Sequence, residues 1–340
     1  MTAAWLARRL LAMLCTLLGI TVVTFAALDL VPVDRATVQA LRAGEDGGFV
    51  DAKAREVAIL RLRAHYGLVD PVTFAPEPLP SRYLAWLQRA VQLDFGGPGD
   101  DGGALWSRVA SALPVTSLLG GLALLLAFTV GVPLGVRAGV GAGSRAERWL
   151  GRVLLAGNAV PDYLFGSLLL LLFAGWHWQW LPSHGLTSPG SADWGMLARL
   201  GDLALHLILP VLTLALGPLV LVMRFVRDAT ARAAAQPFAQ QLHALGLPPE
   251  RIRQRLRRHA LVPLATLVGG LLPMLVGGSV VVESLFSLDG IGQLAFAAVR
   301  DLDHAMVMLL TVIGAIVTLL ALFVSDVLHR LIDPRVRFVA

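Results

Sequence analysis

Long apolar runs with few charges dominate the sequence. Six of them are long enough to cross the hydrocarbon core of a bilayer as helices, which takes roughly 20 residues each. They occupy residues 10–31, 113–136, 153–176, 203–223, 260–285 and 305–325. None alternates apolar with polar positions, as the strands of a membrane β-barrel do. The pattern therefore predicts an all-α polytopic membrane protein with six transmembrane helices.

The first run follows Arg8 and Arg9 and therefore resembles the start of a signal peptide. Its charge-free stretch from Leu10 to Leu28 contains 19 residues. That length exceeds the apolar region of a signal peptide, which is about 7–15 residues. We therefore predict that the first run is an uncleaved transmembrane helix.

Composition supports the same class and excludes several enzyme sites. The chain is 56% hydrophobic and 15% charged, with a mean hydropathy of +0.71; soluble domains carry about 25% charged residues. Cys15 is the only cysteine, which excludes an internal disulfide and a cysteine-based zinc cluster. Lys53 is the only lysine and follows Ala52, so the Gly-Lys pair of a phosphate-binding P-loop is missing. We expect no catalytic residues, metal or cofactor in this chain.

Basic residues are unevenly distributed between the segments that connect the runs. The segments 1–9, 137–152, 224–259 and 326–340 carry 17 basic and 5 acidic residues, whereas 32–112, 177–202 and 286–304 carry 11 and 15. Basic residues favour the cytoplasmic side of the membrane. Both termini are therefore predicted to be cytoplasmic. Trp176, Trp178 and Trp180 fit an aromatic belt at the outer end of the third run.

The segment 32–112 is predicted to form a small outer cap. Two short amphipathic helices are expected at 52–66 and 81–92. The stretch 97–102 matches the dinucleotide-binding pattern G-x-G-x-x-G. No strand pattern precedes it, and its two aspartates would repel a pyrophosphate, so we interpret it as a loop.

The inner segment 224–259 is the most informative for function. Pro237 can start a short helix, PFAQQLHA, and Gly246 suits the left-handed residue that ends it. Pro248-Pro249-Glu250 can then start a second helix. Five arginines follow, Arg251, Arg253, Arg255, Arg257 and Arg258. They favour contact with anionic membrane lipid, but a protruding helix pair also indicates a surface on which a partner docks.

These residues resemble a family, the permease subunits of binding-protein-dependent ABC importers of the dipeptide, oligopeptide and nickel type. The similarity extends from Arg8 to Phe338. It rests on the order of several stretches: RRLLAMLCTLLGITVVTF, HYGLVDP (65–71), SRYLAWL (81–87), LDFG (93–96), ALPVTSLLGGLALLLAFTVGVPLGV (112–136), WLPSHG (180–185), HLILPVLTLAL (206–216), VVESLFSLDGIGQL (281–294) and DPRVR (333–337).

The resemblance implies a type I importer-like fold in the bacterial inner membrane. It implies a homologous second permease, two ABC ATPase subunits that bind ATP, and an extracytoplasmic substrate-binding protein; no nucleic acid is involved. The implied substrate is a di- or oligopeptide, with nickel or another small solute as the alternative. The matching ATPase-coupling residues are Phe238, Ala239, Ala244, Gly246, Leu247, Glu250, Arg251 and Pro263. The loop departs from the family pattern at Pro237 and at 242–245.

Three acidic residues lie within the apolar runs, where charge is costly and often functional. Asp29 is close enough to the end of its run to reach the interface. Asp162 follows Pro161, so its carboxylate can satisfy backbone groups that the proline frees or face a cavity. The family has an acidic residue at the position of Glu283, which either lines the substrate path or caps a helix at the interface.

Glycines recur at helical spacing in two of the runs. Gly131, Gly135 and Gly139 form one row, and the fifth run contains Gly269, Gly270, Gly277 and Gly278. Small residues at this spacing let helices approach closely. We expect these faces to pack against neighbouring helices, within the chain or in a partner.

The predicted organisation has three parts: residues 1–112 with the first helix and the cap, 113–325 as the transport core containing 224–259, and a cytoplasmic tail at 326–340. Two alternative classes of protein are a membrane-embedded enzyme and a passive channel. A membrane-embedded enzyme would need polar groups that converge at membrane depth, and three separate acids do not supply them. A passive channel would have no use for a protruding docking loop.

Overall fold

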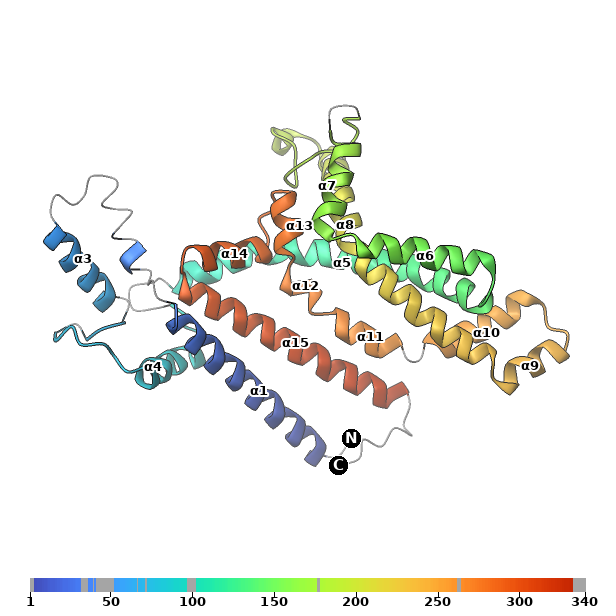
Figure 1. Ribbon diagram of the computed structural model, residues 1–340, viewed down its shortest axis with the longest axis horizontal. Coiled ribbons are helices and arrows are strands. Elements are labelled where there is room, and N and C mark those ends of the chain that lie inside the picture. The colour runs from blue at the N-terminus through green and yellow to red at the C-terminus, as the bar shows by residue number, and fades with distance from the viewer. Residues whose placement is uncertain are drawn as a thin grey trace. The chain divides into compact units, whose positions relative to one another are not determined.

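The structure is a computed structural model that describes residues 3–31, 36–38, 40, 52–65, 67–70, 72–96, 102–175, 178–261 and 264–332. Apart from one bridge between Val69 and Pro76, the regular elements in these ranges are helices (Figure 1). The chain forms two compact units, one of residues 1–112 with 294–319 and the other of 113–293 with 320–340. Two long helices, α5 (Gly102–Val140) and α15 (His304–Ile332), contribute to both.

The first unit is built on α1 (Ala3–Asp29), α3 (Ala52–His65) and α4 (Leu79–Val91). The two helices predicted at 52–66 and 81–92 are therefore present, shifted by at most two residues. In α4, Pro80 lies in the first turn, where the missing N–H of proline costs nothing.

An aromatic cluster joins α4 to the end of α1. The ring of Phe25 lies 5.5 Å from that of Tyr83, and Tyr83 stacks on Trp86 at 5.8 Å. The Tyr83 hydroxyl is also 3.0 Å from Thr21 Oγ1. Most of the apolar side chains along α1 are exposed, among them Leu10, Leu11, Leu14, Leu18, Val22 and Val23. A helix with such an apolar surface is suited to contact with lipid.

The HYGLVDP stretch ends in a tight turn. The Asp70 carboxylate accepts hydrogen bonds from the backbone N–H groups of Val72 and Thr73, at 2.9 and 2.7 Å, and from the Thr73 hydroxyl. These bonds, first of all the one from the Thr73 N–H, lower the pKa of Asp70 below its ordinary value. Asp70 in this stretch therefore stabilises the turn that follows it.

The second unit is a helical bundle around α8 (Met196–Ala234). Its other helices are α6 (Arg145–Ala159), α7 (Asp162–Phe173), the 3₁₀ helix η1 (Ser191–Asp193), α9 (Pro237–Ala244), α10 (Pro249–Leu261), α11 (Leu264–Leu271), α12 (Met274–Gly277) and α13 (Val280–Leu285). Helix α14 (Ile291–Arg300) begins in this unit and ends in the other.

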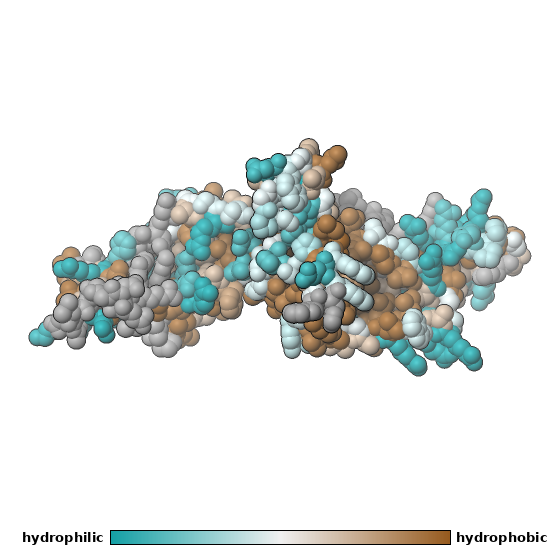
Figure 2. All heavy atoms as spheres, turned by 90° about the horizontal axis from the view of Figure 1, so that it is seen from above, coloured by the Kyte–Doolittle hydropathy of each residue, from teal (hydrophilic) through white to brown (hydrophobic). Residues whose placement is uncertain are grey.

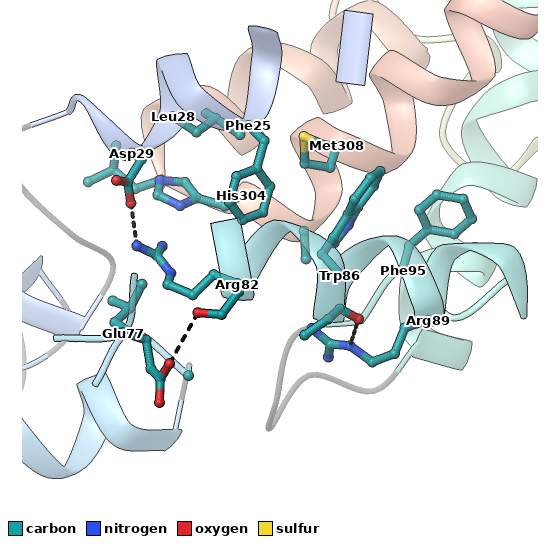
Figure 3. A pocket seen from close by; sticks show the side chains of 16 residues that line it. Phe25, Leu28, Asp29, Glu77, Arg82, Trp86, Arg89, Phe95, His304 and Met308 are labelled. Carbon is teal, nitrogen blue, oxygen red and sulfur yellow. Dashed lines mark hydrogen bonds and ion pairs between the residues drawn. The ribbon is translucent and has the colours of Figure 1, made fainter. Parts of the chain in front are cut away.

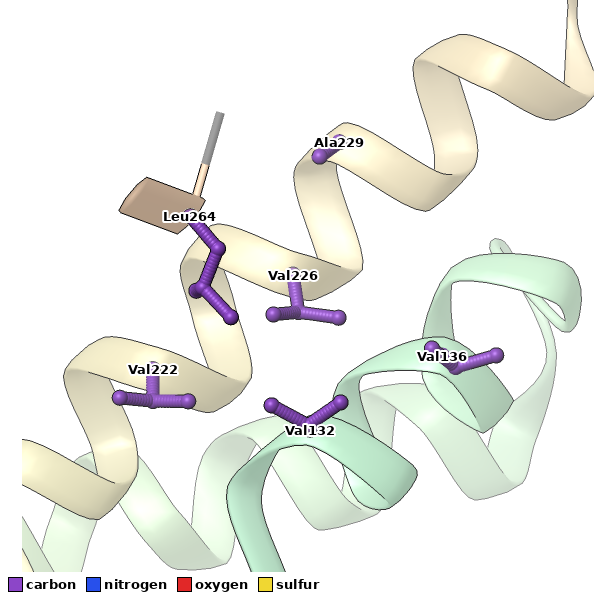
Figure 4. Packing of buried hydrophobic residues seen from close by; sticks show 6 residues of the cluster. All are labelled: Val132, Val136, Val222, Val226, Ala229 and Leu264. Carbon is purple, nitrogen blue, oxygen red and sulfur yellow. The ribbon is translucent and has the colours of Figure 1, made fainter. Parts of the chain in front are cut away.

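The predicted glycine row packs against α8 of the same chain. A Cβ atom on Gly135 would lie 2.6 Å from the carbonyl oxygen of Met223, and one on Gly139 would lie 2.5 Å from Thr230 Cβ. Beside the row, valines of the two helices form a buried cluster with Ala229 and Leu264 (Figure 4). The expected close approach of helices is thus confirmed, and the neighbour is α8.

Two predicted spans are not continuous helices. The third consists of α6 and α7, which bend by 98° at Val160–Pro161. Proline disfavours a helical conformation in the residue before it, and Val160 is extended, with φ −76° and ψ 126°. The fifth is interrupted between α11, α12 and α13, with Gly278 at φ +66°, but its stretch 267–285 as a whole is long and apolar enough to cross a membrane. In the described residues five helices are long and apolar enough to cross a membrane, or six if the bent pair is one span.

Hydrophilic side chains gather where α9 and α10 lie, at the right-hand end of the view in Figure 2.

Two residues of the predicted aromatic belt are described by the structure. Trp178 and Trp180 stack with their rings 5.0 Å apart and are both exposed. Trp176, the third member of the predicted aromatic belt, lies outside the described residues.

Candidate functional site

The helix pair predicted in the segment 224–259 is present and turns at Gly246. Helix α9 ends at Ala244, Gly246 has φ +68°, and α10 begins at Pro249. The Leu247 N–H donates to the carbonyl of Leu242 at 3.4 Å, as in a helix end that reverses through a left-handed residue. The predicted glycine cap and the two proline-started helices are therefore confirmed.

An apolar cluster fixes the helix pair to the end of α8. Its buried members are Ala233 from α8, Ala239 and Leu242 from α9, and Ile252 and Leu256 from α10. Phe238 and Leu247, two of the predicted coupling residues, pack against its edge. Because one cluster holds three helices, a displacement of the pair is expected to move the end of α8 with it.

The tip of the pair is exposed. Ala244, Gly246, Glu250 and Arg251 are all exposed at this end. Sequence reasoning missed Leu245, whose side chain is 75% exposed between Ala244 and Gly246. The signal available in the sequence was its position just before the glycine, where the chain turns away from the cluster.

The remaining positions of this segment are Pro263, Glu250 and the arginines of α10. Pro263, the last predicted coupling residue, lies outside the described residues. Glu250, in the first turn of α10, forms an ion pair with Arg253. The arginines at 251, 255 and 257 are exposed, so the side of α10 away from the cluster is strongly basic.

Helix α8 is long enough to connect this tip with the rest of the second unit. Its 39 residues extend over roughly 58 Å at 1.5 Å per residue, and the hydrocarbon core is about 30 Å thick. Arg227, near its end, binds Glu147 of α6, with Nη2 at 2.9 Å from Oε1. Further along, Gly166 of α7 lies so close that a Cβ there would be 3.1 Å from Thr213 Cγ2. The helix therefore contacts α5, α6, α7, α9 and α10.

Glu283 is buried and connects three helices of the second unit. Its side chain is among the largest that are fully buried. Oε1 accepts from the Thr116 hydroxyl of α5 at 2.9 Å, and Oε2 accepts from the Gln293 N–H of α14 at 2.9 Å. Thr116 Oγ1 in turn accepts from the Ile291 N–H at 2.8 Å. The carboxylate thus caps the beginning of α14, where unsatisfied N–H groups favour negative charge.

Three glycines surround this carboxylate. A Cβ atom on Gly278 would lie 2.8 Å from Glu283 Oε1, one on Gly290 would lie 2.6 Å from Oε2, and one on Gly292 would lie 2.9 Å from Oε2. Real Cβ atoms do not approach this closely, so side chains at these positions would displace the carboxylate. The two glycines of the ESLFSLDGIG stretch, Gly290 and Gly292, are therefore explained by the space that the Glu283 carboxylate requires.

The other two acids within the apolar runs are exposed in this chain. Asp162 occupies the first turn of α7, where the helix dipole favours an acid. Asp29 ends α1 and forms an ion pair with Arg82 of α4; its interfacial position stays a prediction. The structure does not bring Asp162 and Glu283 together with the residues of the helix pair into one site; the pair and the Glu283 cap are separate features.

The fold and the helix pair define a class: an all-helical membrane protein in which an exposed pair of short helices is fixed to the end of a spanning helix. The profile of the family described as "Binding-protein-dependent transport system inner membrane component" matches residues 131–338, and the chain belongs to this family.

Curated relatives match almost the whole chain. The oligopeptide transport system permease protein AppB of Bacillus subtilis is 29% identical, over 99% of this chain and 100% of its own length. A putative peptide permease protein of Brucella ovis is 31% identical over 97% of each chain. The dipeptide transport system permease protein DppB of Escherichia coli is 26% identical over 97% of each.

The chain is therefore a permease component of a binding-protein-dependent transport system and a multi-pass protein of the inner membrane. The predicted family, the fold class and the prediction of a transporter subunit without its own ATPase site are confirmed by this membership. It also implies a binding protein and ATPase subunits as partners.

Proposed function

We propose that this chain is one of two homologous membrane subunits of an ATP-driven importer of short peptides. The relatives described above are named as oligopeptide, dipeptide and peptide permeases, and they match the chain from end to end. Two ABC ATPase subunits bind ATP on the cytoplasmic side, and an extracytoplasmic binding protein delivers the peptide. Both termini of the chain are cytoplasmic, which the excess of basic residues in the inner segments supports.

The observation that carries the proposal is the attachment of α9 and α10 to α8. The tip around Gly246 docks on an ATPase subunit, with Leu245 as the apolar anchor. The buried cluster at Leu242, Ile252 and Leu256 keeps the pair rigid with respect to the end of α8. When ATP closes the ATPase dimer, the tip is displaced and α8 moves with it. The contacts of α8 with α5, α6 and α7 then pass the movement to the helices that line the path.

For the substrate path, we keep Asp162 and Glu283 as the proposed residues. The exposed carboxylate of Asp162 supports its assignment. The Glu283 carboxylate is engaged in capping α14, which favours an indirect role in holding the wall of the path.

Replacement of Leu245 tests the docking proposal. We expect Leu245→Asp to abolish retention of the ATPase subunits when the complex is purified through the permease, because a charge replaces the apolar anchor. The side chain is exposed, so folding is not at stake. Gln240→Asp, at an exposed position on α9, is the matched control and should retain them. Normal ATPase stoichiometry and uptake in Leu245→Asp would contradict docking at this tip.

Uptake by the reconstituted transporter tests the substrate. A labelled di- or tripeptide should accumulate in vesicles that contain the complex, the binding protein and ATP. Unlabelled peptide should compete, and Ni²⁺ at the same concentration should not. Competition by Ni²⁺ alone would assign the system to the nickel alternative and leave the docking mechanism intact.

A further inference from the structure

The first unit contains a cavity that the transport mechanism does not use. It has a volume of about 410 Å³ and lies among the end of α1, the turn at 67–68, α4 and the beginning of α15. All the residues that line it belong to the first unit. A cavity of this size is in the range of small-molecule sites.

The position of the cavity relative to the bilayer follows from the two helices that border it. The apolar helices 4–29 and 304–327 are both candidate membrane spans. Asp29, the last residue of the first, and His304, the first residue of the second, both line the cavity. Since a span ends where the hydrocarbon core ends, the cavity lies at the level of the lipid headgroups.

The lining combines charged and apolar side chains, with Phe25 and Leu28 near Asp29 and with Arg89 near Trp86 and Phe95 (Figure 3). In Figure 3, Asp29, Arg82 and Glu77 lie together on the left, and Trp86, Phe95 and Met308 lie on the right. Arg82 is held by its ion pair with Asp29 and lies over the ring of Phe25, 5.9 Å from its centre. With Arg89, the lining carries two basic and two acidic side chains. Such a balance suits a zwitterion that has an apolar portion.

Two groups in the lining have unused capacity for hydrogen bonds. Trp86 is only 6% exposed, and its Nε1–H has no acceptor among the described residues. The Glu77 carboxylate is partly exposed. Among the described residues it accepts one hydrogen bond, from the Ser81 hydroxyl at 3.3 Å. A buried donor without an acceptor is costly, which favours a ligand that supplies one. Trp86 can therefore donate a hydrogen bond to an anionic or polar group of a ligand, and Glu77 can accept one from a cationic group.

We propose that this cavity binds the headgroup of a zwitterionic phospholipid that carries a primary amine, such as phosphatidylethanolamine. The phosphate accepts hydrogen bonds from Trp86 Nε1–H and from the guanidinium of Arg82, and the ammonium group donates to Glu77. The acyl chains follow the exposed apolar surface of α1. Under the proposed topology the lipid belongs to the outer leaflet, and it fixes α1 and α4 against the beginning of α15.

The choice of headgroup makes the proposal testable. The primary ammonium of phosphatidylethanolamine has three N–H donors, whereas the trimethylammonium of phosphatidylcholine has none. A carboxylate that accepts hydrogen bonds therefore prefers the first lipid. Native mass spectrometry of the assembled transporter, in nanodiscs with equal amounts of the two lipids, measures which one is retained.

We expect the wild-type transporter to retain phosphatidylethanolamine over phosphatidylcholine by roughly tenfold, the value of one strong hydrogen bond to a charged group. Glu77→Gln should remove most of that preference. Trp86→Phe keeps an aromatic ring but removes the donor, and should lower retention of both lipids by roughly two- to tenfold. Glu56→Gln, which removes an exposed carboxylate on α3 away from the cavity, is the control and should behave as the wild type.

Three results would overturn the proposal. The first is equal retention of the two lipids by the wild type. The second is an unchanged preference in Glu77→Gln, in a preparation with wild-type size-exclusion behaviour. The third is displacement of the lipid by a zwitterionic peptide at concentrations that saturate transport, with Glu77→Gln weakening the peptide instead. That last result would show that the cavity takes the substrate.

Discussion

At the residue scale, the backbone at Gly246 decides the shape of the turn between α9 and α10. Its φ of +68° is unfavourable for a residue with a side chain, although a Cβ atom there would meet no described atom within 4 Å. The cost of a substitution is therefore conformational and not steric. This separates Gly246 from the glycines around Glu283, where the space itself is occupied.

We expect Gly246→Ala to weaken the turn by roughly 1 kcal/mol and Gly246→Val to weaken it further, because a branched side chain tolerates a left-handed conformation least. The variants should be inserted in the membrane normally. Retention of the ATPase subunits and peptide uptake should fall in the order wild type, alanine, valine. Full retention and uptake with valine would show that this turn does not couple the subunits.

At Glu283, both carboxylate oxygens accept backbone hydrogen bonds, so the replacement of one oxygen is expected to affect stability. In Glu283→Gln an amide N–H₂ replaces one acceptor oxygen and faces the N–H of Ser279 or of Gln293. The loss of one hydrogen bond to a charged group should destabilise the protein by roughly 1.5–3 kcal/mol. The midpoint of SDS-induced unfolding measures this. An unchanged midpoint with reduced uptake would instead place the carboxylate on the substrate path.

At the scale of elements, the packing of α5 on α8 depends on the glycine row. A Cβ on Gly135 would lie 2.6 Å from a backbone oxygen of α8, whereas one on Gly121 of the same helix would have Leu275 Cδ2 at 4.0 Å as its neighbour. Replacement by alanine adds the same methyl group at both positions, so a difference in stability between the two variants reports the difference in their surroundings.

Gly135→Ala should therefore separate the two helices and cost roughly 1–3 kcal/mol. Gly121→Ala should be neutral or slightly stabilising, because alanine favours helix more than glycine does. Thermal denaturation of the purified complex, followed by size-exclusion chromatography, compares the two. Equal stability of both variants would mean that the helices are not in close contact.

The extent to which elements could be predicted depended on whether the signal was local. Pro237, Gly246 and Pro249 mark the helix pair within a dozen residues, so its bounds were predictable. The cap at Glu283 joins groups from α5, α13 and α14, and no local pattern reports such a contact. The break at Pro161 was missed because the apolar run continues through it, and hydropathy does not register the loss of one N–H. Leu245 was noted only as a departure from the family pattern, since exposure is a property of the folded turn.

At the scale of the whole molecule, the topology remains a prediction from charge. In a Cys15→Ser background, Glu56→Cys should react with a membrane-impermeant maleimide in intact cells. Gln240→Cys, on α9, should react only after lysis. Both positions are exposed, so burial does not limit the reaction. Labelling in the opposite order would place the termini outside and would remove α9 and α10 from reach of an ATPase.

The bend between α6 and α7 has a consequence for how the chain enters the membrane during synthesis. Helix α7 has 12 residues and extends over roughly 18 Å, too short to cross the core alone. Helix α6 begins with Arg145 and carries Arg148 and Arg152, so it is a poor substrate for the insertion machinery. Helices α6 and α7 are therefore expected to insert into the membrane only after α8 has been synthesised. Chains truncated before residue 196 and released from the ribosome should leave α7 accessible to protease, and chains that contain α8 should protect it.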